Sequence, residues 1–147
     1  MSTDQSVTQQ LIETLENGRD GYEKGAKKLR DAGQSQLADA FEHYADQRAG
    51  FAADLTSIAS AYGDGVEESG TMAGAIHRGW MTLKDAASGS SPSGVLDVAT
   101  EGEKHAVEEF EKALEADVSP DLRSVIQRQL VEVRAALAAV SAMRIAG

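Results

Sequence analysis

Apolar residues recur along this sequence at steps of three and four, which is the spacing of one face of an α-helix. The spacing is clearest between residues 35 and 62, where it passes through one charged residue. The positions there are Leu37, Phe41, Tyr44, Arg48, Phe51, Leu55, Ile58 and Tyr62. Few segments alternate apolar and polar residues with a period of two, so the sequence predicts an all-α protein.

Prolines and glycines mark the ends of the expected helices. The two prolines, Pro92 and Pro120, each follow a serine, and a serine N-cap before a first-turn proline is a common helix start. Gly33 and the stretch 63–65 end helical segments. We therefore expect long helices at about 5–31, 35–62, 92–116 and 120–145, and a shorter helix at about 70–87.

The connections between these segments predict how the helices are arranged. Four long helices of similar length suit a bundle, and the short turns near residues 33 and 118 make two antiparallel hairpins. The connection between the hairpins carries the shorter helix and is long enough to run the length of the bundle. Two hairpins joined by one long crossover form the ferritin-like arrangement. We expect all 147 residues to form this single domain.

The other three long helices carry similar stripes, and each stripe is interrupted near its middle. The first helix has Val7, Leu11, Leu15, Gly18, Tyr22, Ala26 and Leu29. The third has Leu96, Ala99, Glu103, Ala106, Phe110 and Ala113, and the fourth has Leu122, Ile126, Gln129, Val133, Ala136 and Val140. The interruptions are therefore a glycine, an arginine, a glutamate and a glutamine, one in each helix.

These interruptions predict a central polar layer, because the midpoints of antiparallel helices of equal length lie at similar height. We expect Arg48, Glu103 and Gln129 to meet there, with Gly18 leaving space beside them. A buried arginine needs a carboxylate, so Glu103 is its expected partner, and Gln129 or Tyr44 would complete the network. In the alternative, these side chains lie at the edge of the core and Arg48 extends to water.

Composition and charge exclude several functions. The chain has 24 Asp and Glu against 14 Lys and Arg, a net charge of −10 that would repel nucleic acid and anionic membranes. It has no cysteine, so disulfides and cysteine-ligated zinc are excluded. Residues 1–10 do not have the pattern of a signal peptide, and no apolar run is long enough to cross a bilayer. We expect a soluble cytoplasmic protein.

Glu101 and His105 are the weak candidates for metal ligands, because a spacing of four places them on one helix face. A di-iron or di-manganese bundle needs a Glu-x-x-His motif in two helices, and the sequence has none. An arginine in the central layer would also place a positive charge where metal ions would bind. We therefore expect no cofactor, with Glu101 and His105 directed toward solvent.

The crossover and the first helix hold two further candidates. We expect Trp80 to pack the crossover helix onto the bundle, with His77 beside it, although the two could instead form a binding surface. Gly18, Gly21 and Gly25 are costly inside a helix and indicate close backbone approach by a neighbour, such as the crossover helix or another subunit. The alternative is that they make this helix flexible.

Five stretches resemble a bacterial family of small ferritin-like four-helix-bundle proteins of unknown function. They are NGRDGYEKGA, DQRAGFAADL, SGTMAGAIHRGWMTLK, EGEKHAVEEFEKAL and SPDLRSVIQRQ, and the resemblance runs from about residue 10 to 144. The GAxHRGW and EGExxA patterns are the most specific. The resemblance implies a ferritin-like bundle in a bacterial cytoplasm and no assigned catalytic residue. Where the family usually has Asp-Gly, this chain has Asn17-Gly18.

No phosphate-binding loop, catalytic triad or nucleotide fingerprint occurs in the sequence. We therefore expect a non-enzymatic interaction or stress-associated protein. Analogy with ferritin-like folds implies that it forms a homo-oligomer. One alternative is a metal-dependent ferritin-like oxidase or storage protein. Another is a carrier of a small apolar ligand, held between the helices near Tyr22 and Tyr44.

Overall fold

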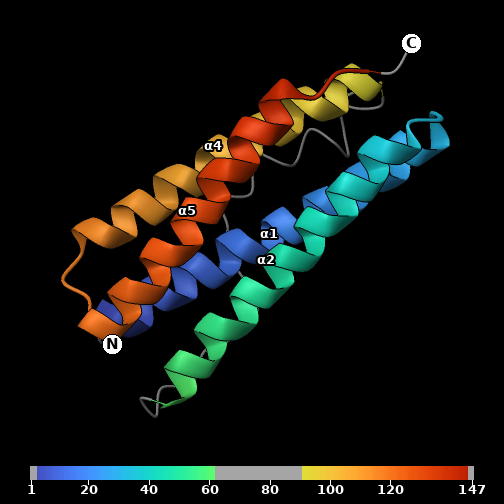
Figure 1. Ribbon diagram of the computed structural model, residues 1–147. Coiled ribbons are helices and arrows are strands. Elements are labelled where there is room, and N and C mark those ends of the chain that lie inside the picture. The colour runs from blue at the N-terminus through green and yellow to red at the C-terminus, as the bar shows by residue number, and fades with distance from the viewer. Residues whose placement is uncertain (1–2, 62–90, 146–147) are drawn as a thin grey trace.

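The computed structural model describes residues 3–61 and 91–145, and every regular element in these ranges is an α-helix. The helices are α1 (Thr3–Asp31), α2 (Ser35–Ala61), α4 (Pro92–Glu115) and α5 (Pro120–Ala142). They form two hairpins, α1–α2 and α4–α5, that lie side by side (Figure 1). The all-α prediction is confirmed for this part of the chain. The expected helix at 70–87, with His77 and Trp80, lies outside the described residues.

The helix starts agree with the serine–proline signals. The Ser91 hydroxyl accepts a hydrogen bond from the Gly94 N–H at 3.1 Å, and the Ser119 hydroxyl accepts one from the Leu122 N–H at 3.4 Å. These bonds satisfy N–H groups that have no acceptor within the helix. The Asp4 carboxylate in turn accepts the Ser119 N–H at 2.9 Å, which ties the start of α1 to the α4–α5 turn (Figure 1).

The turn between α1 and α2 depends on Gly33. This residue has a φ of 81°, a left-handed conformation that glycine adopts without strain. The N–H of Gly33 donates to the Arg30 carbonyl and the N–H of Gln34 donates to the Leu29 carbonyl, the pair of bonds that closes a Schellman cap. The chain can therefore reverse within a few residues and begin α2 at Ser35.

The last helix ends earlier than the sequence predicts. It stops at Ala142, whereas we expected it to reach about residue 145. Met143 is extended, with φ −65° and ψ 145°, and Arg144 donates hydrogen bonds to the carbonyls of Ser141 and Met143. These bonds occupy carbonyls at the helix end, so the chain can leave the helix there.

The helices pack unevenly around the core. Helix α1 packs closely against both α2 and α4, and α4 packs against α5, whereas α2 and α5 make little contact with each other. Helices α2 and α4 therefore lie on one diagonal of the bundle, and α1 and α5 on the other. A side chain that joins α2 to α4 has to cross the centre of the molecule.

The predicted stripes of α4 and α5 are confirmed, because every position in them is buried. In α2 the prediction is correct at Phe41, Arg48 and Leu55, whereas the other described positions of the stripe are displaced by one residue. Its buried face includes four alanines, whereas the larger residues beside them are only partly buried. The buried alanines are Ala38, Ala45, Ala52 and Ala59, and the partly buried neighbours are Leu37, Tyr44, Phe51 and Ile58. Small side chains allow α2 to approach α1 closely.

The apolar core consists of two clusters separated along the bundle. The first contains Leu15, Ala52 and Ala106 at its inner edge, and the second contains Tyr22, Ala45 and Ala99. The positions between these edges are Gly18, Arg48 and Glu103, and all three are buried. A polar level therefore divides the apolar core near its middle.

Candidate functional site

Arg48 and Glu103 form a buried ion pair across the diagonal between α2 and α4. The two terminal nitrogens of the guanidinium each donate to a different carboxylate oxygen, both at 2.6 Å. Arg48 is 1% exposed and Glu103 is 0% exposed. This two-point geometry matches the planar fork of arginine to a carboxylate and fixes the orientation of both groups.

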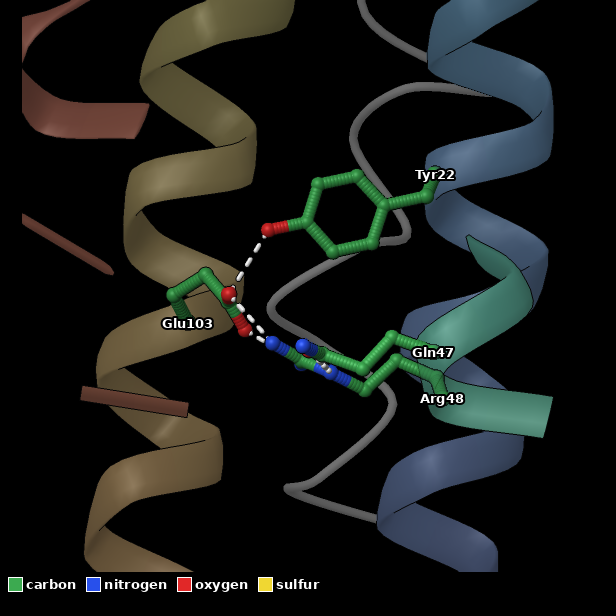
Figure 2. A network of polar contacts seen from close by, with 4 residues as sticks. All are labelled: Tyr22, Gln47, Arg48 and Glu103. Atoms are coloured by element: carbon green, nitrogen blue, oxygen red, sulfur yellow. Dashed lines mark hydrogen bonds and ion pairs between the residues drawn. The ribbon is translucent and has the colours of Figure 1, made fainter. Parts of the chain in front are cut away.

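Tyr22 adds a third helix to this network. Its hydroxyl donates to Oε2 of Glu103 at 2.7 Å, and its ring lies 5.6 Å from the Arg48 guanidinium carbon. The distance is within the range of a cation–π contact. Figure 2 shows Tyr22 reaching from α1, Arg48 from α2 and Glu103 from α4 toward one point. The network therefore joins three helices and both hairpins.

The side chain of Arg48 is held along its length. Its Nε donates to the Gln47 side-chain oxygen at 3.3 Å, the remaining contact drawn in Figure 2. A Cβ placed on Gly18 would lie 3.6 Å from Nη1 and 3.7 Å from Cγ of Arg48. The room beside Gly18 is thus filled by Arg48, so this glycine does not indicate vacant space for an apolar ligand.

Gly25 is a second glycine of α1 at which neighbouring helices of the bundle approach closely. A Cβ there would lie 2.9 Å from two ring carbons of Phe41 and 3.3 Å from Val95. We expected the glycines to be approached by the crossover helix or by another subunit. The structure places α2 and α4 against Gly25 instead.

Burial and charge act together on the ionisable groups of the network. Burial raises the pKa of Tyr22 well above its ordinary value, and the adjacent Glu103 carboxylate raises it further. Burial by itself lowers the pKa of Arg48, but the Glu103 charge and its hydrogen bonds outweigh burial, so the pKa of Arg48 is raised. The network therefore keeps a protonated tyrosine and a charged guanidinium well above neutral pH.

Tyr44 lies near the network, but it is not among the observed hydrogen-bond partners of Glu103 or Arg48. Its ring centroid is 5.4 Å from that of Tyr22, and the side chain is only partly buried. Burial, and then the Glu103 charge, raise the pKa of Tyr44. We predicted that Tyr44 or Gln129 would complete the network, but Tyr22 is the residue that binds Glu103.

Gln129 is buried, at 3% exposure, but it lies away from the ion pair. Its Nε2 donates to the Phe51 carbonyl at 3.2 Å, whereas Oε1 has no hydrogen-bond partner among the described residues. On α5 the first cluster extends to Val133 and the second begins at Val140. The level of the ion pair therefore crosses α5 beyond Val133. We expected the midpoint of α5, with Gln129, to lie at the level of the ion pair. It does not, because α5 is displaced along the bundle relative to the other helices.

Glu101 and His105 do not form a metal site within the described residues. Glu101 is exposed and lies 3.4 Å from Lys104, while His105 is partly buried rather than fully directed to solvent. Across residues 3–61 and 91–145, no three His, Asp or Glu side chains gather closely enough to hold one metal ion. Glu103, the buried carboxylate, has both oxygens occupied by Arg48 and Tyr22.

Sequence reasoning missed the role of Tyr22. Its position in the α1 stripe, one step after Gly18, placed it in the core, and a buried tyrosine hydroxyl usually finds a hydrogen-bond partner. This preference of buried tyrosines for a hydrogen-bond partner was the signal in the sequence that could have identified Tyr22. It predicts that Tyr22 needs an acceptor, but only the three-dimensional arrangement shows that the acceptor is Glu103.

The described residues thus define an all-α protein of two helical hairpins joined by a buried Arg–Glu–Tyr network. Residues 5–116 match the sequence model of a family described as a domain of unknown function, DUF2383. The chain belongs to this family, since the match covers well over half of its length. The matched region includes all but the first two residues of α1, the whole of α2 and α4, and all three network residues, and it ends before α5.

Comparisons with curated proteins and with solved structures found no match. None of the helices described is both long and apolar enough to cross a membrane.

Proposed function

We propose that this protein is a ferritin-like bundle without enzymatic activity, in which the Arg48–Glu103–Tyr22 network takes the place of a di-metal centre. It would act as an interaction or stress-associated protein. The family resemblance implies only a ferritin-like bundle in a bacterial cytoplasm. The observation that carries the proposal is the placement of Arg48. Its guanidinium lies 2.6 Å from each oxygen of the buried Glu103 carboxylate.

The charges at this level support the proposal. A di-metal bundle surrounds its ions with inward carboxylates and histidines from all four helices. Here α1 contributes Gly18 and Tyr22, α2 contributes a permanently charged arginine, and α4 contributes a carboxylate neutralised by that arginine. The Arg48 guanidinium repels cations at this level. It also occupies the Glu103 carboxylate, which is the buried carboxylate of α4 and would otherwise be available to a metal ion.

Burial supports a structural role for the network. Tyr22 and Glu103 are 0% exposed and Arg48 is 1% exposed, so no substrate reaches their polar atoms without opening the bundle. A buried ionic network can specify one arrangement of packed helices. In this proposal the network fixes how the two hairpins dock, and the outer surface carries the biological interaction.

Metal content tests the proposal directly. The full chain is purified after growth with added iron, manganese and zinc, and is measured by native mass spectrometry and elemental analysis. We expect no stoichiometric metal in the unaltered chain. The matched variant is Glu101→Gln, which removes an exposed carboxylate on the same helix without disturbing the core.

Metal that disappears in the Glu101→Gln variant belongs to the surface and agrees with an ion-free core. One or more metal ions per chain that remain in this variant, with anomalous scattering between the helices, would overturn the proposal. Because Glu101 is exposed, the comparison does not depend on a variant with an altered core.

A further inference from the structure

The open side of the bundle, between α2 and α5, carries a groove of about 400 Å³. Its apolar lining comes from Phe51 on α2 and from Val125 and Val131 on α5. Helices α2 and α5 make little contact with each other, so this side of the bundle is less closed than the others. We call the surface formed by the groove and the adjoining face of α5 the α2–α5 surface.

Val131 is an unusual residue on this surface. It is 61% exposed, and Val131 and Ile145 are the large apolar side chains that remain exposed in the described part of the chain. Ala135, Ala138 and Ala142 are also exposed and follow Val131 at steps of four, three and four. Helix α5 therefore has a second apolar stripe outside the core, and its small residues would allow another helix to approach closely.

Charged side chains of both signs lie along the same groove. Asp54 and Glu132 contribute carboxylates and Arg128 contributes a guanidinium, all three exposed. None of them takes part in an ion pair observed within residues 3–61 and 91–145. An apolar centre with charged side chains at its edge is the usual composition of a protein–protein interface.

We propose that the α2–α5 surface binds the same surface of a second copy of this chain in a two-fold symmetric dimer. In such a contact Val131 of each copy packs on the apolar lining of the other. Arg128 of each copy faces Asp54 and Glu132 of the other, because a two-fold axis makes every contact reciprocal. The inference rests on the proposed function, since a non-enzymatic bundle acts through its surface.

Charge favours a second copy at this place. The whole chain has a net charge of −10, so most of its faces repel one another. The segment from Pro120 to Ile145 differs, because it holds four arginines and only two carboxylates. Two copies can therefore meet along α5 with less like-charge repulsion than elsewhere, and their unpaired charges are complementary.

Gln129 also lines the groove, but it is 3% exposed and belongs to the core beneath the surface. The acceptors at the surface are the exposed carboxylates of Asp54 and Glu132. The partner's Arg128 would bring five N–H donors to these two carboxylates. The exposed charges that one copy leaves without an ion pair thus match those of the other.

Sedimentation equilibrium with the full chain tests the inference. We expect the unaltered chain to dimerise reversibly. The Arg128→Glu variant and the Glu132→Arg variant should each dimerise about tenfold more weakly or worse, equivalent to about 1.4 kcal/mol. An equimolar mixture of the two variants should recover a dimer, because each supplies the charge that the other lacks.

Two matched controls separate the surface from general effects. Arg19→Glu makes the same change of net charge at an exposed position on α1, and Ile145→Lys places a charge at the other exposed apolar residue. Both should dimerise as the unaltered chain does, whereas Val131→Lys should abolish the dimer. All the substituted side chains are exposed, and circular dichroism checks that each variant keeps its helices.

The inference is overturned by a monomer at all concentrations, by Arg19→Glu weakening the dimer as much as Arg128→Glu, or by a dimer that survives Val131→Lys. A monomeric, metal-free chain would overturn the inference and leave the proposed function standing. Metal retained in the core would overturn the proposed function, while the variant mixture still decides how the copies meet.

Discussion

Arg48 and Glu103 face each other across the diagonal of the bundle, with both nitrogen–oxygen distances at 2.6 Å. The two residues come from different hairpins and lie at the level where the apolar core divides in two. A one-turn shift of one hairpin against the other would separate them and leave two buried charges unpaired. The pair thus selects one register of the hairpins.

Removing one partner of the pair should be costly. We expect Glu103→Leu to lower the free energy of unfolding by about 3–5 kcal/mol, because it leaves a buried guanidinium without its carboxylate. The triple variant Tyr22→Phe, Arg48→Met and Glu103→Leu should recover most of this loss, since apolar side chains of similar size remove both charges and the buried hydroxyl that Glu103 accepts. Urea unfolding measures each variant.

The matched control for this prediction is Arg134→Met. Arg134 and Glu111 form an exposed pair at 2.8 Å, and such pairs contribute about 0–1 kcal/mol. If Glu103→Leu cost no more than Arg134→Met, the central pair would not have the structural importance given to it here.

Tyr22 should make the stability of the protein sensitive to alkaline pH. Because the folded pKa of Tyr22 is raised, the unfolded chain loses this proton first, near pH 10. The stabilisation from Tyr22 is therefore complete below about pH 10 and is lost as pH rises toward the folded pKa. Tyr22→Phe should cost about 1.5–3 kcal/mol at neutral pH, and this cost should shrink above pH 10.

Chemical unfolding at pH 7 and at several values above 10 measures this difference. Tyr44→Phe is the comparison. Tyr44 is partly exposed and its hydroxyl is not among the donors to Glu103, so its raised pKa should give a smaller change in the same direction. A cost of Tyr22→Phe that stayed constant across the pH series would contradict the raised pKa.

Two glycines of α1 should respond to alanine in opposite directions. At Gly18 a Cβ would meet Arg48 at 3.6 Å, an ordinary contact, so Gly18→Ala should stabilise by up to about 1 kcal/mol through helix propensity. At Gly25 a Cβ would lie 2.9 Å from the Phe41 ring, and such overpacking typically costs about 1–3 kcal/mol. Thermal unfolding of the two variants gives the sign of each change, and equal signs would refute the packing described for α1.

Arg123 should stabilise the end of α4. Its guanidinium donates to the Leu114 carbonyl at 2.7 Å and to the Ala116 carbonyl at 3.0 Å, groups that have no partner within the helix. We expect Arg123→Met to cost about 1–2 kcal/mol in urea unfolding, because these hydrogen bonds involve a charged donor and are partly buried. Arg19→Met, an exposed substitution of the same kind on α1, should change stability far less.

Within residues 3–61 and 91–145, the sequence by itself determined the four helices, their starts and most of the buried positions. Serine before proline predicted the starts at Pro92 and Pro120, and the stripes of α4 and α5 are buried at every position. These features are local, because capping and helical periodicity depend on residues within a few positions of one another. The sequence also suggested Glu103 as the carboxylate for Arg48, since a buried arginine requires one.

Only the tertiary structure decided how the helices meet. It placed Tyr22 on Glu103, buried the alanines of α2 in preference to their larger neighbours, and displaced Gln129 from the central pair. These outcomes depend on how far each helix is shifted and how closely it approaches the next. Such distances result from the packing of side chains on separate helices, and the periodicity of one helix contains no information about them.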